Sequence, residues 1–116
     1  AARLRPDWAE PLTAQAWALA TSGDEKIRNG AEAVKLAEKA ADITSRQQPA
    51  VLNTLAAAYA EAGRFDEAVA TANQALDLAK RANQTNLVNK IEQAITLYQS
   101  HTPLREKASV EPASWP

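Results

Sequence analysis

The chain has 116 residues, 46 % of them apolar, and a formal net charge of −1 from 13 basic and 14 acidic side chains. This length gives room for about one domain with one core, and the balanced charge argues against nucleic-acid binding and against an anionic membrane surface as partner. The absence of cysteine excludes disulfides and thiolate chemistry, and no apolar run approaches the roughly 18 residues of a membrane-spanning helix.

Helix-forming residues fill the chain between a few glycines and prolines. Residues 50–102 contain no proline, and the stretches between glycines are rich in alanine, leucine, glutamate, lysine and glutamine. Apolar residues recur at three- and four-residue steps, whereas the alternation typical of strands is missing. We therefore expect an all-α protein with helices over about residues 8–21, 30–45, 49–63, 65–82 and 84–100.

The first two helices have polar residues at their expected starts. Asp7 is placed to cap the first helix, with Glu10 reaching back toward the cap. Asn29 precedes the second helix, and Glu32 follows three residues later, which is a weaker form of the same arrangement. Both starts are therefore predicted from short-range chemistry alone.

Proline and glycine delimit the later helices. Pro49 is a good first helical residue, and Gly63 ends the third helix because the turn that follows needs a positive φ. The fifth helix ends before Pro103. The segment 105–116 has no periodicity and is predicted to be an irregular tail, with Trp115 exposed in it.

Two segments of the chain resemble each other. Residues 31–43 (AEAVKLAEKAADI) align with residues 66–78 (DEAVATANQALDL), so that Ala33 matches Ala68 and Ala40 matches Ala75, an offset of 35 residues. A two-helix unit that recurs at this distance is typical of a helical solenoid. Short side chains at these positions let antiparallel helices approach closely, while larger residues fill the remaining gaps.

Residues 52–76 show a further pattern. The positions that form it are Leu52, Leu55, Ala56, Tyr59, Gly63, Phe65, Glu67, Ala68, Ala75 and Leu76. This unit resembles the tetratricopeptide repeat family, in which a large residue, a leucine, a small residue and a tyrosine lie on the first helix, followed by a turn glycine, an aromatic residue and two small residues. The residue type differs from the usual one at Leu52, Ala56 and Ala72, where the family often has tryptophan, glycine and an aromatic residue.

The resemblance implies a right-handed superhelical stack of antiparallel helix pairs. The expected units are repeat one at about 9–47, repeat two at about 49–82 and a capping helix at about 84–101, all within a helical domain 1–104. The stretch AARLRPDWAEPL at the start of the chain looks like the end of a further repeat. On this interpretation the chain is a C-terminal fragment of a longer bacterial array, and its fifth helix covers the last apolar face.

The family resemblance also implies a protein–protein interaction module or scaffold that holds a peptide or partner helix in the concave groove of the stack. Trp17 would anchor a side chain and Asn53 would hydrogen-bond a peptide backbone; packing of Trp17 against the third helix and solvation of Asn53 are the alternatives. No lysine lies on this face, so the lysine–asparagine clamp of some family members is not expected. The predicted groove residues are Glu10, Thr13, Trp17, Thr21, Asn53, Ala57 and Glu61.

Catalysis, a cofactor and a metal site are not predicted. The chain has one histidine, His101, and lacks a glycine-rich phosphate loop. Two other functions stay open: a structural capping segment that self-associates as a homodimer, and a regulatory appendage of a larger enzyme such as a transferase. The expected partner is a protein or peptide, with no nucleic acid and no membrane contact. The compartment is undetermined; the cytoplasm is preferred, with the periplasm as the alternative if the parent protein is membrane-anchored.

Overall fold

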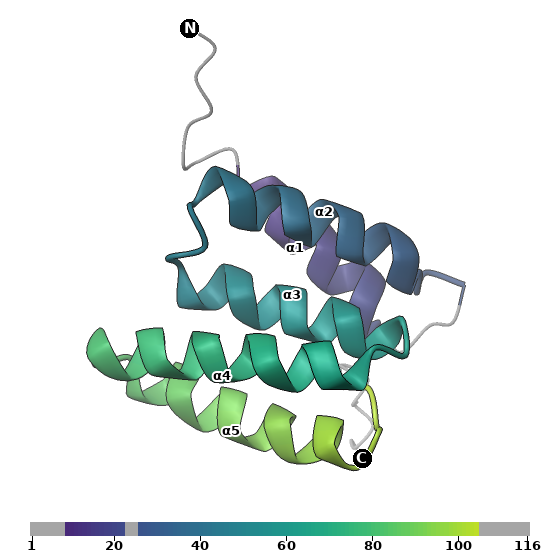
Figure 1. Ribbon diagram of the computed structural model, residues 1–116. Coiled ribbons are helices and arrows are strands. Elements are labelled where there is room, and N and C mark those ends of the chain that lie inside the picture. The colour runs from purple at the N-terminus through teal and green to yellow at the C-terminus, as the bar shows by residue number, and fades with distance from the viewer. Residues whose placement is uncertain (1–8, 23–25, 105–116) are drawn as a thin grey trace, which may run out of the picture.

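The computed structural model describes residues 9–22 and 26–104, apart from the side chain of Glu10. Within these residues the protein is all-α and contains no strand. The predicted cap at Asp7 and the predicted tail 105–116 lie outside the described residues. The helices, labelled in Figure 1, are α1 (Ala9–Thr21), α2 (Gly30–Ile43), α3 (Pro49–Glu61), α4 (Phe65–Arg81) and α5 (Thr85–Gln99).

These helices confirm the five that the sequence predicts, with ends that differ by at most two residues. The predicted starts of α2 and α3 are also confirmed. The side chain of Asn29 accepts a hydrogen bond from the backbone N–H of Glu32 at 3.1 Å, and Pro49 occupies the first turn of α3. Both arrangements leave fewer backbone N–H groups unpaired at a helix start.

Four helices end in the same capping turn. After α3, the N–H of Gly63 bonds to the carbonyl of Ala60 at 3.0 Å, and the N–H of Arg64 bonds to the carbonyl of Tyr59 at 2.8 Å. This pair of bonds requires a left-handed residue after the cap, and Gly63 supplies it with a φ of 83°. The corresponding residues after the other three helices are not glycine: they are Ser45, Asn83 and His101, with φ values of 57°, 58° and 55°.

Helix α3 lies at the centre of the protein and contacts each of the other helices (Figure 1). Consecutive helices pack against each other along the chain, and α3 also contacts both α1 and α5. Between the described parts of α2 and α4 there is no comparable contact. Ten consecutive residues of α3, 51–60, are consequently buried.

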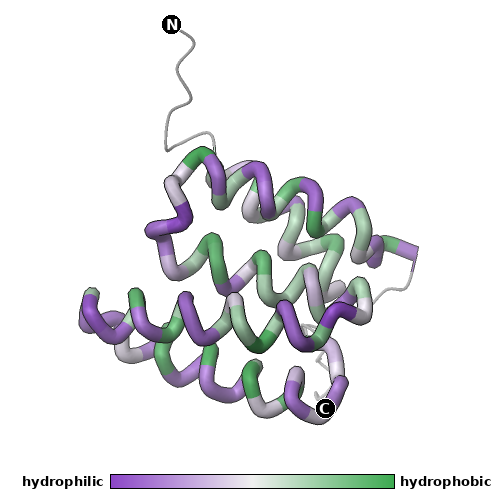
Figure 2. The backbone as a smooth tube through the Cα atoms, in the orientation of Figure 1, coloured by the Kyte–Doolittle hydropathy of each residue, from purple (hydrophilic) through white to green (hydrophobic). Residues whose placement is uncertain are grey.

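Alanine dominates the interface between these helices. Ala56 on α3, and Ala68 and Ala75 on α4, are fully buried, as close helix packing at these positions predicts. Figure 2 shows polar and apolar residues following one another along α4. The buried residues of this helix form a narrow stripe, and its first and last turns carry charged side chains. Tyr59 is also buried, whereas Phe65 is partly exposed and stacks on His101, with ring centroids 5.1 Å apart.

A close backbone approach fixes α2 against the end of α3. A Cβ atom added to Gly30 would lie 2.8 Å from the backbone nitrogen of Ala62 and 2.9 Å from the carbonyl carbon of Glu61. These distances are shorter than real Cβ contacts, and backbone atoms cannot move aside as a flexible side chain can. The first residue of α2 must therefore lack a side chain for the two helices to pack as they do.

Candidate functional site

The groove residues predicted on α1 are held by their own helix. The hydroxyl of Thr13 donates to the carbonyl of Ala9, and that of Thr21 donates to the carbonyl of Trp17, both at 2.7 Å. Thr13 is partly exposed, whereas Thr21 is fully buried. Both hydroxyl protons are therefore used within the helix, which leaves only the oxygen lone pairs for other groups.

Trp17 is partly buried and packs against the hydrophobic core. The alternative role considered for this side chain, packing within the protein, therefore accounts for part of its surface. Its remaining exposed surface is the part that a partner would contact. Glu10 precedes Trp17 by seven residues on α1, and its side chain lies outside the described residues.

Asn53 and Ala57, the groove residues predicted in the middle of α3, lie deeper than expected. Only 9 % of Asn53 and 1 % of Ala57 is exposed, which corrects the expectation that both face an open surface. The physical reason is the central place of α3, which contacts each of the other four helices. Burial at this depth depends on tertiary packing, which the spacing along a single helix does not report.

The amide of Asn53 has an incomplete set of hydrogen bonds. Its Oδ1 atom is buried and finds no hydrogen-bond partner among the described residues. A buried acceptor without a donor costs on the order of 1–3 kcal/mol relative to a satisfied one. Asn53 Oδ1 is therefore a buried acceptor that the fold leaves without a donor among the described residues.

Glu61, the last predicted groove residue, takes part in an ion pair that the sequence did not indicate. One of its carboxylate oxygens lies 3.6 Å from Nε of Arg28, and the two side chains are 16 % and 18 % exposed. Arg28 also donates to the carbonyl of Ser22 at 2.8 Å. The guanidinium thus links the end of α1, the turn before α2 and the end of α3.

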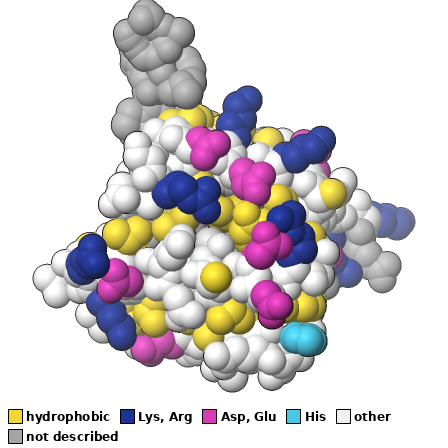
Figure 3. Space-filling model, in the orientation of Figure 1, with side chains coloured by type: hydrophobic (Ala, Val, Ile, Leu, Met, Phe, Trp, Pro, Cys, Tyr) yellow, Lys and Arg dark blue, Asp and Glu magenta, His cyan; other side chains and the backbone are white. Residues whose placement is uncertain are grey.

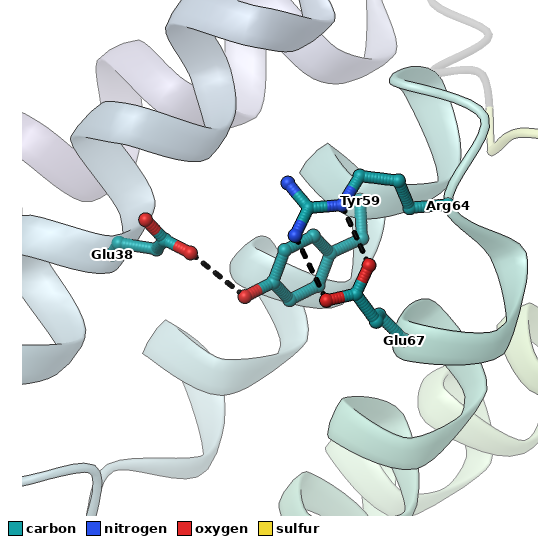
Figure 4. A network of polar contacts seen from close by, with 4 residues as sticks. All are labelled: Glu38, Tyr59, Arg64 and Glu67. Atoms are coloured by element: carbon teal, nitrogen blue, oxygen red, sulfur yellow. Dashed lines mark hydrogen bonds and ion pairs between the residues drawn. The ribbon is translucent and has the colours of Figure 1, made fainter.

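A second polar cluster, which we call the Tyr59 network, joins α2, α3 and α4 (Figure 4). It consists of Glu38, Tyr59, Arg64 and Glu67. The Tyr59 hydroxyl donates to Oε2 of Glu38 at 2.8 Å, and the Arg64 guanidinium lies 4.6 Å from the centre of the Tyr59 ring. Arg64 also forms a bidentate pair with Glu67, with distances of 2.6 and 2.8 Å.

The charges in this network stabilise one another in fixed protonation states. Burial and the hydrogen bond to Glu38 raise the pKa of Tyr59, which keeps its hydroxyl protonated as a donor. The hydrogen bond from Arg64 lowers the pKa of Glu67 and keeps it ionised. Tyr59 and Glu67 are thus each held in one protonation state, as a structural network requires.

The sequence indicates only part of the Tyr59 network. Arg64 and Glu67 are three residues apart around the start of α4, a spacing that brings side chains together on a helix. Glu38 and Tyr59 are 21 residues apart and meet only because α2 packs on α3. This contact depends on tertiary packing and could not be predicted from the positions of the two residues in the sequence.

The surface over α2, α3 and α4 carries charges of both signs interspersed with apolar side chains (Figure 3). A hollow of about 430 Å³ beside the Tyr59 network is lined by Gly63, Arg64, Phe65, Asp66, Glu67 and His101. No group of three or more His, Asp or Glu side chains in the described part of the chain could hold a metal ion. None of the described helices is both long and apolar enough to cross a bilayer.

Comparisons with known proteins do not assign a function, so any assignment must be argued from the residues described above. No protein-family model matches the chain, and neither the curated proteins nor the solved structures give a match.

Proposed function

We propose that this protein is a helical-repeat interaction module of the tetratricopeptide kind, which binds a peptide or partner helix along the face formed by α1, α3 and α5. The observation that carries this proposal is the pattern of helix contacts. The odd-numbered helices contact one another in succession, whereas α2 and α4 do not meet within the described residues. A stack of helix pairs has this pattern because its first helices line one side and its second helices the other.

The burial of matched positions supports the same repeat. Ala33 and Ala68 are equivalent at an offset of 35 residues, and both are fully buried. The pair Ala40 and Ala75 behaves in the same way. Methyl groups therefore lie at corresponding buried points of α2 and α4.

Two side chains on the α1–α3 face favour peptide binding. Trp17 combines a partly buried ring with an exposed part, which suits an interface anchor. The Oδ1 of Asn53 is unpaired but buried, so a backbone N–H of the partner would reach it only if binding displaces the side chains that cover it. Binding would then satisfy an acceptor that the free protein leaves without a partner among its described residues.

Selection from a random displayed peptide library against the immobilised protein tests this function. Isothermal titration calorimetry would then compare the selected peptide on the wild type and on Trp17→Ala, Asn53→Ala and Asn73→Ala. Asn73 is exposed on α4, outside the proposed binding face, and serves as the control. We expect Trp17→Ala to weaken binding by about tenfold or more, Asn53→Ala to weaken it less, and Asn73→Ala to leave it unchanged.

Two outcomes would contradict the proposal. One is a library that yields no peptide above the background of an empty support. The other is a selected peptide that binds all four proteins equally, since its site would then lie elsewhere. Sedimentation velocity over a range of protein concentrations distinguishes peptide binding from the competing function, a capping segment that self-associates. Such a segment forms a concentration-dependent dimer without any peptide.

A further inference from the structure

One dipeptide at the start of α2 has a chemical property that the proposed function does not use. Asn29 is exposed and caps the helix, and Gly30 is its next residue. The chain contains six asparagines, and Asn29 is the only one followed by glycine. The other five precede larger residues: they are Asn53, Asn73, Asn83, Asn86 and Asn89.

The fold requires each of these two residues for a separate reason. The cap needs a short side chain with an acceptor, which Asn29 supplies to the N–H of Glu32. The packing of α2 on the end of α3 leaves no room for a Cβ atom at Gly30. The two demands fall on neighbouring positions, and together they place an asparagine directly before a glycine.

We propose that Asn29 is a site of spontaneous modification through a cyclic imide. The backbone nitrogen of Gly30 attacks Cγ of Asn29 and forms a new C–N bond. The bond from Cγ to the side-chain nitrogen breaks, and ammonia leaves with the proton that the Gly30 nitrogen loses. Water then opens the ring at either carbonyl, giving aspartate or isoaspartate at position 29. Glycine favours the attack because it has no side chain to obstruct it and the freest backbone.

The folded protein restrains this reaction at two atoms. Oδ1 of Asn29 is held by the N–H of Glu32 at 3.1 Å, and the backbone N–H of Asn29 donates to the carbonyl of Leu19 at 2.8 Å. Ring closure must turn the side chain away from Glu32 and bring Cγ over the nitrogen of Gly30. The reaction rate at Asn29 therefore depends on how often the start of α2 opens.

The two products affect the helix in opposite ways. Aspartate at position 29 keeps the capping acceptor and adds a negative charge at the positive end of the α2 dipole. Isoaspartate inserts an extra methylene group into the main chain directly before Gly30. This displaces the segment that approaches the backbone of Ala62 most closely, so we expect isoaspartate to loosen the packing of α2 on α3.

Peptide mapping by mass spectrometry tests the proposal on the full chain incubated in mildly alkaline buffer. The readout is the gain of a single dalton, where OH replaces NH₂, and the other five asparagines are internal controls. We expect the conversion to concentrate at Asn29 and to run roughly tenfold or more faster in urea than in native buffer. Conversion at Asn29 no faster than at the other asparagines in urea would overturn the proposal, and equal rates with and without urea would overturn the restraint by the fold.

A matched variant separates the chemistry from folding. Gly30→Ala is compared with the wild type in urea, where the contact with Ala62 no longer matters. The added methyl group should slow the conversion at Asn29 by about tenfold or more, because it obstructs the attacking nitrogen. An unchanged rate in this variant would show that the cyclic imide is not the route.

Discussion

The central helix α3 and the last helix α5 carry the two tyrosines of the chain, and the two hydroxyls have different surroundings. Tyr59 on α3 is 7 % exposed, and its hydroxyl reaches the carboxylate of Glu38. Tyr98 on α5 is fully buried, and its hydroxyl has no hydrogen-bond partner among the described residues. Deeper burial therefore does not bring better pairing, since a hydroxyl at the edge of the core can reach a charged group at the surface.

Helix α3 is also more extensively buried than helix α5. All residues from 51 to 60 of α3 are buried, whereas the buried positions of α5 are Ile91, Ala94 and Tyr98. Neighbours on several sides hold α3 in place. Helix α5 packs mainly on α4 and can shift outward, so the same kind of substitution should cost less there.

Enlarging a buried alanine should give the largest effect in this comparison. Ala56→Leu places three extra carbons where α3 has no free surface, and we expect a loss of about 1–3 kcal/mol or more of unfolding free energy. Ala94→Leu on α5 should cost less, and Ala70→Leu, at an exposed position of α4, should be nearly neutral. Urea unfolding followed by circular dichroism measures all three. Equal losses at positions 56 and 94 would contradict the difference drawn between the helices.

The ends of α3 and α5 provide the next test. Both are followed by a left-handed residue, Gly63 after α3 and His101 after α5. A Cβ atom at Gly63 would meet nothing within 4 Å, so Gly63→Ala isolates the backbone strain, which we expect to cost about 1–2 kcal/mol. Gly63→Asn should cost less, because asparagine adopts this conformation after α4 at Asn83. Thermal unfolding distinguishes the variants, and a neutral Gly63→Ala would show that the turn relaxes.

Removing the hydroxyl of Tyr59 should have a smaller effect. Tyr59→Phe loses the bond to Glu38, and we expect a loss of about 1 kcal/mol, because Glu38 is partly exposed and returns to water. A double-mutant cycle with Glu38→Gln, in which the amide oxygen still accepts, measures the charge-dependent part of the interaction. Strictly additive effects of the two substitutions would mean that the charge of Glu38 contributes nothing to the bond with Tyr59.

Removing the hydroxyl of Tyr98 should have the smallest effect, and of the opposite sign. Tyr98→Phe deletes a buried polar atom that has no hydrogen-bond partner among the described residues, so we expect stability to stay level or to rise by up to about 1 kcal/mol. A loss as large as that of Tyr59→Phe would show that the Tyr98 hydroxyl is paired in solution, for example to a water.

The wild type and Tyr98→Phe should also differ in their stability at alkaline pH. Burial raises the pKa of Tyr98 well above the ordinary value of a tyrosine, about 10, so the unfolded chain loses this proton more easily than the folded one. The corresponding stability is complete below pH values of about 10 and falls as pH rises from there. Unfolding in urea at increasing pH should show a shallower decline for Tyr98→Phe than for the wild type. Identical declines would mean that Tyr98 is not the group responsible.

Features with a local cause could be predicted from the sequence. The five helices, the cap at Asn29, the start at Pro49 and the turn at Gly63 all depend on residues within one or two helical turns. The left-handed conformation of Ser45 could not be predicted in this way, since serine does not favour it.

The candidate site was harder to predict because it depends on which helices meet. The periodicity of α3 places Asn53 beside a packing seam, but its burial depends on the helices packed around α3, which the periodicity does not report. The pairing of Glu61 with Arg28 likewise crosses from one helix end to a distant turn. A single sequence fixes the spacing within a helix and says much less about the partner that each side chain meets.

The alanine-lined interior has a calorimetric consequence. Of the 23 buried apolar residues among those described, sixteen are alanine, so each carries a single methyl group into the core. Unfolding then exposes less hydrocarbon per residue than it would from a leucine-rich interior. Because the heat capacity of unfolding scales with that newly hydrated area, this protein should have a small heat-capacity increment. Its free energy should therefore curve only gently with temperature.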